Sequence, residues 1–97
     1  MAKITVKNEK SAGSNHPKGY ASWLAYWEEQ QGRKAPHCLA GICQNAAEVG
    51  AQVTKVGVKD KKVYILPVCK PCDEYKDEYL VDESDLVLVP GQKDDNV

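Results

Sequence analysis

The chain of 97 residues carries a formal net charge of −1 and is 42% hydrophobic, which suits one small domain with a modest core. No stretch approaches the roughly 18 consecutive apolar residues of a membrane-spanning helix, so we expect neither a second domain nor an integral membrane protein. Phe is absent and aromatic residues make up only 7%, so the core must consist mainly of aliphatic side chains. A chain of this size buries roughly 60–70% of its unfolded surface and gains much from an added cross-link or metal ion.

The charges are unevenly distributed along the sequence. Residues 1–36 and 37–72 each have a surplus of three positive charges, whereas residues 73–97 have nine acidic side chains and two lysines. A nucleic-acid-binding protein usually presents a basic face on a basic domain, so this distribution does not favour a general nucleic-acid binder.

The first residues show no targeting pattern, because residues 1–7 contain no basic segment followed by an apolar one. We therefore expect a cytoplasmic protein. Cysteines stay reduced in that compartment, where close pairs are more often metal ligands than disulfides.

The N-terminal part, residues 1–19, contains one short alternating run at residues 4–6 within a polar segment. We expect it to form an arm or an edge strand. Residues 20–90 are expected to form the single domain, and residues 91–97 an acidic, solvated tail.

An amphipathic helix is predicted over residues 22–31. Ser22 can cap its first turn, and Gly32 supplies a stop signal. The spacing i, i+3, i+4 and i+7 defines a stripe of Trp23, Tyr26, Trp27 and Gln30. We expect the stripe to pack against the domain; the alternative is that one Trp anchors a protein partner, because Trp is common at interface hot spots.

A β-hairpin is predicted in the middle of the chain. Residues 48–58 and 63–68 are rich in β-branched side chains, and the polar residues 59–62 between them favour a turn. A short helix over residues 73–79 should follow, with Pro71 at its start. Residues 86–89, stopped by Pro90, are predicted as a C-terminal strand that could join the hairpin.

Four cysteines form two close pairs, Cys38-x4-Cys43 and Cys69-x2-Cys72, separated by 25 residues. Two short loops can each aim two sulfurs at one ion, which is the usual arrangement of a tetrahedral four-cysteine zinc site. We therefore expect Zn²⁺ bound by these four side chains, and the domain over residues 20–90 to be a zinc-binding domain.

Other interpretations of the cysteines remain open. His37 could replace one thiolate, since the x4 spacing leaves room for it. A thioredoxin-like redox pair needs βαβ surroundings that this chain hardly provides, and disulfides require an oxidising compartment. An iron–sulfur cluster also accepts four thiolates, but the 25-residue gap matches neither ferredoxin pattern.

Residues 38–79 resemble the treble-clef zinc fingers, and more narrowly the HNH nuclease family. The resemblance is carried by residues 50–53 (Gly-Ala-Gln-Val), 64–68 (Tyr-Ile-Leu-Pro-Val) and 69–73 (Cys-Lys-Pro-Cys-Asp). It implies an α+β fold, a small zinc-stapled treble-clef domain made of a zinc knuckle, a β-hairpin and a short helix. The amphipathic helix would precede this unit and the C-terminal strand would follow it.

The catalytic positions of that family are replaced here. The resemblance places Gln52 where the family has its general-base His, Tyr64 where it has an orienting Asn, and Asp73 where it has a metal-binding His or Asn. Glutamine has no basic nitrogen, and a tyrosine with an ordinary pKa near 10 is a poor base at neutral pH. We therefore expect a non-catalytic, zinc-binding interaction module with a protein partner.

The alternative is an HNH-like nuclease or a nucleic-acid-binding protein with a rearranged site. Such a site could use Asp73, His37 or His16, and nucleic acid could bind at the lysines near the hairpin tip, namely Lys55, Lys59, Lys61 and Lys62. So few lysines neutralise too few phosphates for tight binding at physiological salt.

Overall fold

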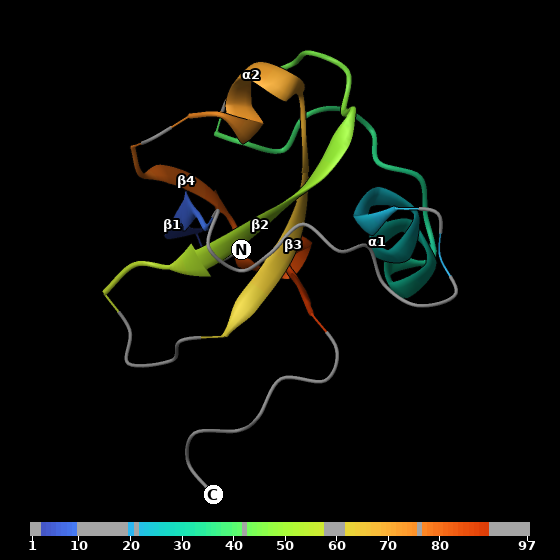
Figure 1. The fold of residues 1–97 in the computed structure, drawn as a ribbon, viewed down its shortest axis with the longest axis horizontal. Coiled ribbons are helices and arrows are strands. Elements are labelled where there is room, and N and C mark those ends of the chain that lie inside the picture. Colours follow the sequence, from blue (N-terminus) through green and yellow to red (C-terminus); the bar gives the residue numbers. More distant parts are fainter. Residues whose placement is uncertain are drawn as a thin grey trace, which may run out of the picture.

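The computed structural model describes residues 3–9, 20, 22–41, 43–57, 62–75 and 77–89. These residues form a small α+β arrangement with one antiparallel sheet, whose strand order is β4-β1-β2-β3-β5 (Figure 1). The elements in chain order are β1 (Lys3–Asn8), α1 (Trp23–Gln31), β2 (Val49–Lys55), β3 (Val63–Val68), α2 (Lys70–Asp73), β4 (Tyr79–Asp82), the 3₁₀ turn η2 (Glu83–Asp85) and β5 (Val87–Leu88). None of the helices in these ranges combines the length and hydropathy that a bilayer crossing requires.

The β2–β3 hairpin forms the centre of the sheet. β3 has the bounds predicted from the sequence, and β2 lies within the predicted range 48–58. The strands pair from Val49 opposite Val68 to Thr54 opposite Val63. The predicted turn at residues 59–62 lies outside the described residues except for Lys62.

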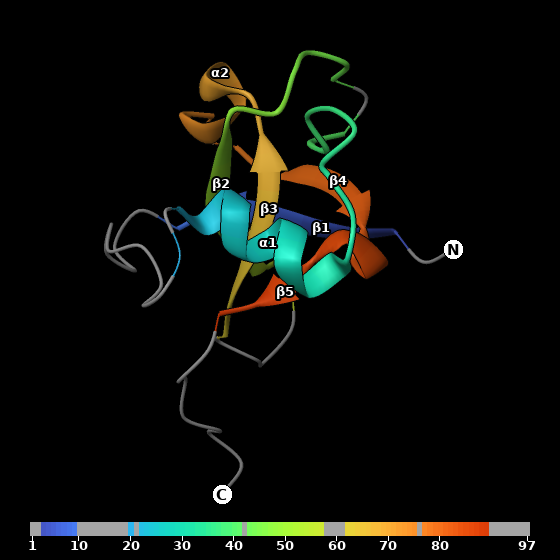
Figure 2. The same cartoon turned by 90° about the vertical axis from the view of Figure 1, so that its right-hand side faces the viewer.

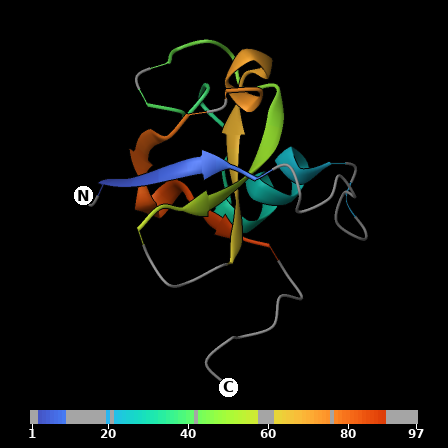
Figure 3. The same cartoon turned by 60° about the vertical axis from the view of Figure 1, so that its left-hand side comes forward.

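The N-terminal segment contains a strand, as expected, but β1 lies inside the sheet, so the expected edge position is wrong. β1 pairs with β2 on one side, through Val6 opposite Lys55, and with β4 on the other, through Ile4 opposite Val81 (Figure 3). The sequence did not predict β4, and β4 takes the edge position that β1 would otherwise occupy. The rest of the predicted N-terminal segment, residues 10–19, lies outside the described residues, as does the tail at 91–97.

The helix predicted over residues 73–79 is also wrong. α2 covers only Lys70–Asp73, and Tyr79 already belongs to β4, where it pairs with Val6. Sheet pairing and the burial of Val81 outweigh the weak helical preference of this polar segment. The C-terminal strand expected at residues 86–89 corresponds to the two-residue β5, which pairs with β3.

Helix α1 packs on the face of the sheet formed by β2, β3 and β5 (Figure 2). The Ser22 side chain accepts a hydrogen bond from the Ala25 amide at 3.1 Å, and Gly32 ends the helix with a φ of 71°. Trp27 is fully buried, whereas Gln30, the fourth member of the predicted stripe, is exposed. The buried surface of the helix is therefore narrower than the predicted stripe.

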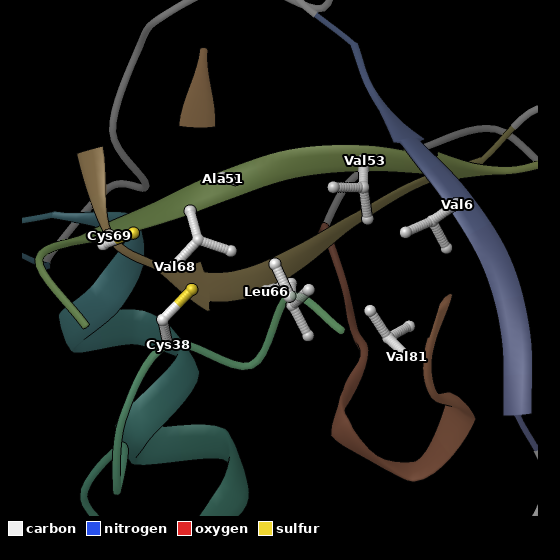
Figure 4. Packing of buried hydrophobic residues seen from close by; sticks show 9 residues of the cluster. Val6, Cys38, Ala51, Val53, Leu66, Val68, Cys69 and Val81 are labelled. Carbon is white, nitrogen blue, oxygen red and sulfur yellow. The ribbon is translucent and has the colours of Figure 1, made fainter. Parts of the chain in front are cut away.

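The other face of the sheet carries the main hydrophobic cluster. Its members come from β1, β2, β3 and β4 and from the cysteine loops: Val6, Cys38, Ala40, Ala51, Val53, Leu66, Val68, Cys69 and Val81. Cys38 and Cys69 lie at one end of the cluster, and Val6 and Val81 at the other (Figure 4). The cysteine loops thus form part of the core.

Candidate metal centre

The four cysteines converge at one end of the β2–β3 hairpin. The sulfur atoms of Cys38, Cys43, Cys69 and Cys72 all lie within 4.8 Å of one another, and all four are free thiols. The sulfurs of Cys43 and Cys69 are 3.7 Å apart. A tetrahedral ion with metal–sulfur bonds of 2.3 Å has sulfur–sulfur edges of about 3.8 Å, so the cluster has the dimensions of such a site.

The first cysteine pair lies in a tight loop that is held by its own backbone. The Cys38 amide donates to the Asn45 carbonyl at 2.7 Å, and the Cys43 amide donates to the Ala40 carbonyl at 3.1 Å. Gly41 lies between them with a φ of 59°, a conformation that costs glycine little. The loop brings both sulfurs to the same side.

The second pair begins where β3 ends. Cys69 is the residue before α2 and Cys72 lies within α2, so one turn of helix aims both sulfurs at the first loop. The Asp73 amide donates to the Cys69 carbonyl at 3.0 Å. Glu48 connects this turn to the start of β2, because its carboxylate accepts a hydrogen bond from the Lys70 amide at 3.1 Å.

The two loops are also joined directly. The Leu39 amide donates to the Pro67 carbonyl of β3 at 2.9 Å. The side-chain amide of Asn45 lies 3.8 Å from the Cys69 sulfur and donates toward it. The first loop is therefore fixed to the strand that carries the second pair.

The four thiols differ in burial and in acidity. Cys38 and Cys69 are buried, whereas Cys43 and Cys72 are half-buried. Burial raises the pKa of Cys38 and of Cys72, and neighbouring thiols raise the pKa of Cys72 further. Burial opposes ionisation of Cys69 too, but hydrogen bonds from the Cys72 amide and thiol and from Asn45 lower its pKa to about 7.

These acidities have a chemical consequence. Thiolates crowded this closely repel one another, so only a cation among them allows all four to ionise. The arrangement can therefore bind a divalent metal ion through four sulfurs.

His37 does not belong to the group of possible ligands. The group with mutually close donor atoms contains the four cysteines. The His37 side chain is exposed, and its Nδ1 lies 2.7 Å from the Cys38 carbonyl oxygen, to which it can donate. Its position suits a loop contact beside the cysteines.

Of the three positions that the expected resemblance assigns to HNH catalytic residues, two lie on opposite faces of the β2–β3 hairpin. Gln52 pairs with Ile65 and faces α1, and its buried Oε1 has no hydrogen-bond partner among the described residues. Tyr64 lies on the opposite face, against the hydrophobic cluster, with the Lys55 ammonium 4.6 Å from its ring centre. Asp73 is at the end of α2, and His16 lies outside the described residues.

Of the four lysines considered for nucleic-acid binding, only Lys55 and Lys62 lie among the described residues. Lys55 forms an ion pair with Glu83 at 3.1 Å, and its side chain is only 16% exposed. Burial opposes the charge of Lys55, but its interactions with Glu83 and Tyr64 together outweigh the burial and raise its pKa. Lys59 and Lys61 lie outside the described residues.

One residue at the site was missed by the sequence analysis. The side-chain amide of Asn8 in β1 donates to the carbonyls of Cys72 at 2.8 Å, Asp73 at 3.1 Å and Tyr75 at 2.8 Å. The hydroxyl of Tyr79 donates to Asn8 Oδ1 at 2.8 Å. No sequence pattern links Asn8 to Cys72, because 64 residues separate them.

Comparison with known proteins identifies no homologue of this chain. The site consists of four convergent thiols on two loops. The described ranges contain no second cluster of possible metal ligands. The chain matches no protein-family model, no curated protein and no solved structure.

Proposed function

We propose that this chain is a zinc-binding domain whose four cysteines, Cys38, Cys43, Cys69 and Cys72, hold one Zn²⁺ ion. The observation that carries the proposal is the convergence of all four sulfurs within 4.8 Å. Four sulfur donors in a tetrahedral arrangement favour zinc or an iron–sulfur cluster, and the spacing of the cysteines does not follow a ferredoxin pattern.

The role of the metal in this proposal is structural. Cys38 and Cys69 are part of the hydrophobic cluster, so an ion bound there joins the two loops within the core. Structural zinc contributes on the order of 10 kcal/mol of folding free energy in small fingers, which is large for a chain of this size. A site with four protein ligands also leaves no open position for a substrate or water.

The order of elements supports a treble-clef arrangement. A loop with two cysteines is followed by the β2–β3 hairpin and then by α2, which is preceded by Cys69 and contains Cys72. The chain surrounds this unit with β1 and β4 on one side of the sheet and with α1 across one face. The resemblance to the HNH family accordingly concerns the framework around the metal.

We further propose that the domain is a non-catalytic module that binds a protein partner. The separation of Gln52 and Tyr64 on opposite faces of the hairpin supports the absence of HNH chemistry. The segment that follows the metal centre offers a surface for a partner, because Tyr75 is 49% exposed among the exposed acidic residues Glu74 and Asp77. Such a surface suits a partner with basic and aromatic side chains.

The zinc proposal is tested by metal content and fold together. Native mass spectrometry should find one zinc per chain, and a strong chelator should remove both the zinc and the β-sheet signal in circular dichroism. Cys72→Ala should behave like the chelated protein, whereas Glu29→Ala, on the exposed side of α1, should keep both properties. Retention of the fold without bound metal would contradict a structural role for zinc.

A further inference from the structure

The amide group of Asn8 connects the N-terminal strand to the loop that carries Cys72. Its Nδ2 lies within hydrogen-bond distance of three backbone carbonyls at the end of α2 and just after it, those of Cys72, Asp73 and Tyr75. α2 has only four residues, and the last carbonyls of a helix have no partner within the helix. Asn8 supplies such a partner from a strand that is distant in the sequence, in addition to the Tyr75 amide at the Cys72 carbonyl.

The orientation of the Asn8 side chain is fixed by Tyr79. The Tyr79 hydroxyl donates to Asn8 Oδ1 at 2.8 Å, which leaves Nδ2 directed at the three carbonyls. The reversed orientation would place Oδ1 against carbonyl oxygens, and it would turn the NH₂ group toward a hydroxyl that could then only accept. Tyr79 is half-buried and contributes to the edge of the hydrophobic cluster, so its hydroxyl is held in place by packing.

The contacts bear directly on one metal ligand. The Cys72 carbonyl that accepts from Asn8 also accepts from the Tyr75 amide at 3.1 Å, so the backbone around Cys72 is held from two directions. The direction of the Cys72 sulfur depends on the backbone conformation of this single turn. Removing a group that hydrogen-bonds to a metal ligand typically lowers metal affinity by roughly 10–100-fold.

We propose that Asn8 is a positioning residue of the metal centre, oriented by Tyr79, and that it sets the direction of the Cys72 sulfur. This inference rests on the proposed zinc site. It extends the site beyond the two cysteine loops to β1 and β4, neither of which carries a ligand.

The test compares four variants with the wild type. Asn8→Ala removes the amide, and Tyr79→Phe removes only the hydroxyl that orients it. Lys7→Ala is the control for the same strand, because Lys7 is exposed and is adjacent to Asn8 on the other face. Ile65→Val is the control for general destabilisation, because Ile65 is fully buried in β3 and is not part of the cluster around the cysteines.

Two properties are measured for each variant. Zinc affinity is determined by competition with a chromophoric chelator, and Co²⁺ is substituted to record the d–d absorption bands, which report the tetrahedral geometry of the sulfur ligands. We expect Asn8→Ala to weaken zinc binding by roughly tenfold and to shift the Co²⁺ bands. Tyr79→Phe should show a smaller loss and a shift in the same direction, whereas both controls should retain the wild-type Co²⁺ spectrum.

The outcomes separate the two proposals. If the wild type binds neither Zn²⁺ nor Co²⁺, the proposed function itself fails. If the wild type binds both ions and Asn8→Ala has the spectrum of Ile65→Val, Asn8 is merely structural and the inference is overturned. If Asn8→Ala does not fold, Tyr79→Phe decides, because it keeps the ring and loses one hydrogen bond: an unchanged spectrum and affinity would overturn the inference.

Discussion

The indole nitrogen of Trp27 donates a hydrogen bond to the backbone carbonyl of Asp85 across 2.7 Å. This contact joins α1 to η2 through two residues that lie 58 positions apart in the sequence. The Asp85 carboxylate also forms an ion pair with Arg33 at 2.9 Å, and the Arg33 guanidinium lies 5.0 Å from the centre of the Trp27 ring. The end of α1 is thereby attached to the C-terminal part of the sheet.

Trp27→Phe should therefore destabilise the protein by about 1–3 kcal/mol, because it leaves the Asp85 carbonyl without its partner and removes buried apolar area. Trp23→Phe is a matched control. The Trp23 Nε1 is buried and has no hydrogen-bond partner among the described residues, so its removal breaks no such bond. Urea unfolding of both variants measures the difference, and an equal cost at the two positions would contradict this role of the Trp27 indole.

At Gly50, strand β2 approaches the start of α1 closely. A Cβ at this position would lie 2.7 Å from the Leu24 nitrogen and from the Trp23 carbonyl carbon. Gly50→Ala should therefore displace the start of α1 and cost about 1–3 kcal/mol, as overpacking usually does. The near-ultraviolet circular dichroism of Trp23 should change with it.

Gly57→Ala is the control for the glycine substitution itself. Its Cβ would meet nothing within 4 Å, but its φ of +82° strains any other residue, so a loss of stability is expected there as well. The aromatic signals should not change, because none of the described residues comes within 4 Å of a Cβ at Gly57. An unchanged aromatic spectrum in Gly50→Ala would show that α1 does not pack as described.

The ligand set can be tested one residue at a time. Cys43→Ser should abolish tight zinc binding even though Cys43 is only half-buried, because three thiolates and a hydroxyl form a much weaker site. His37→Ala should leave both zinc affinity and thermal stability within error of the wild type. The zinc stoichiometry of each purified variant measures this, and loss of zinc in His37→Ala would place the imidazole among the ligands.

The absence of HNH chemistry is a prediction of its own. The chain should not nick supercoiled plasmid with Mg²⁺, Mn²⁺ or Ni²⁺, since Gln52 and Tyr64 lie on opposite faces and provide no general base. The same assay is carried out on Asp73→Ala, because Asp73 is a candidate residue of a rearranged nuclease site. Metal-dependent cleavage by the wild type that is lost in Asp73→Ala would favour a nuclease with a rearranged site.

Nucleic-acid binding without cleavage is tested separately. Affinity for DNA that falls steeply with salt and is lost on replacing Lys59, Lys61 and Lys62 would favour a nucleic-acid partner. Lys55→Ala would instead reduce stability, because Lys55 pairs with Glu83 and covers the Tyr64 ring. We expect weak, salt-sensitive binding at most.

Local signals in the sequence were sufficient for much of the central fold. Ser22 and Gly32 are found at the two ends of α1, because capping depends on the residue itself and its nearest neighbours. The bounds of β3 followed from its β-branched run, and the cysteine spacing placed all four sulfurs in one cluster. Each of these features is encoded within a few residues.

The errors arose where distant segments decide the structure. β1 lies inside the sheet because β4 pairs with it, and among the four residues of β4 only Val81 is buried. The same pairing draws Tyr79 away from the predicted helix. Asn8 could not be found at all, because its role depends on the contact between β1 and α2, which only the fold creates.

The most direct test of the zinc centre is the zinc K-edge X-ray absorption spectrum of the purified protein, with the metal content determined on the same sample. We expect one zinc per chain, surrounded by four sulfur atoms at about 2.3 Å. A first shell with nitrogen or oxygen in place of one or more sulfurs, or a folded protein that contains no metal, would contradict it.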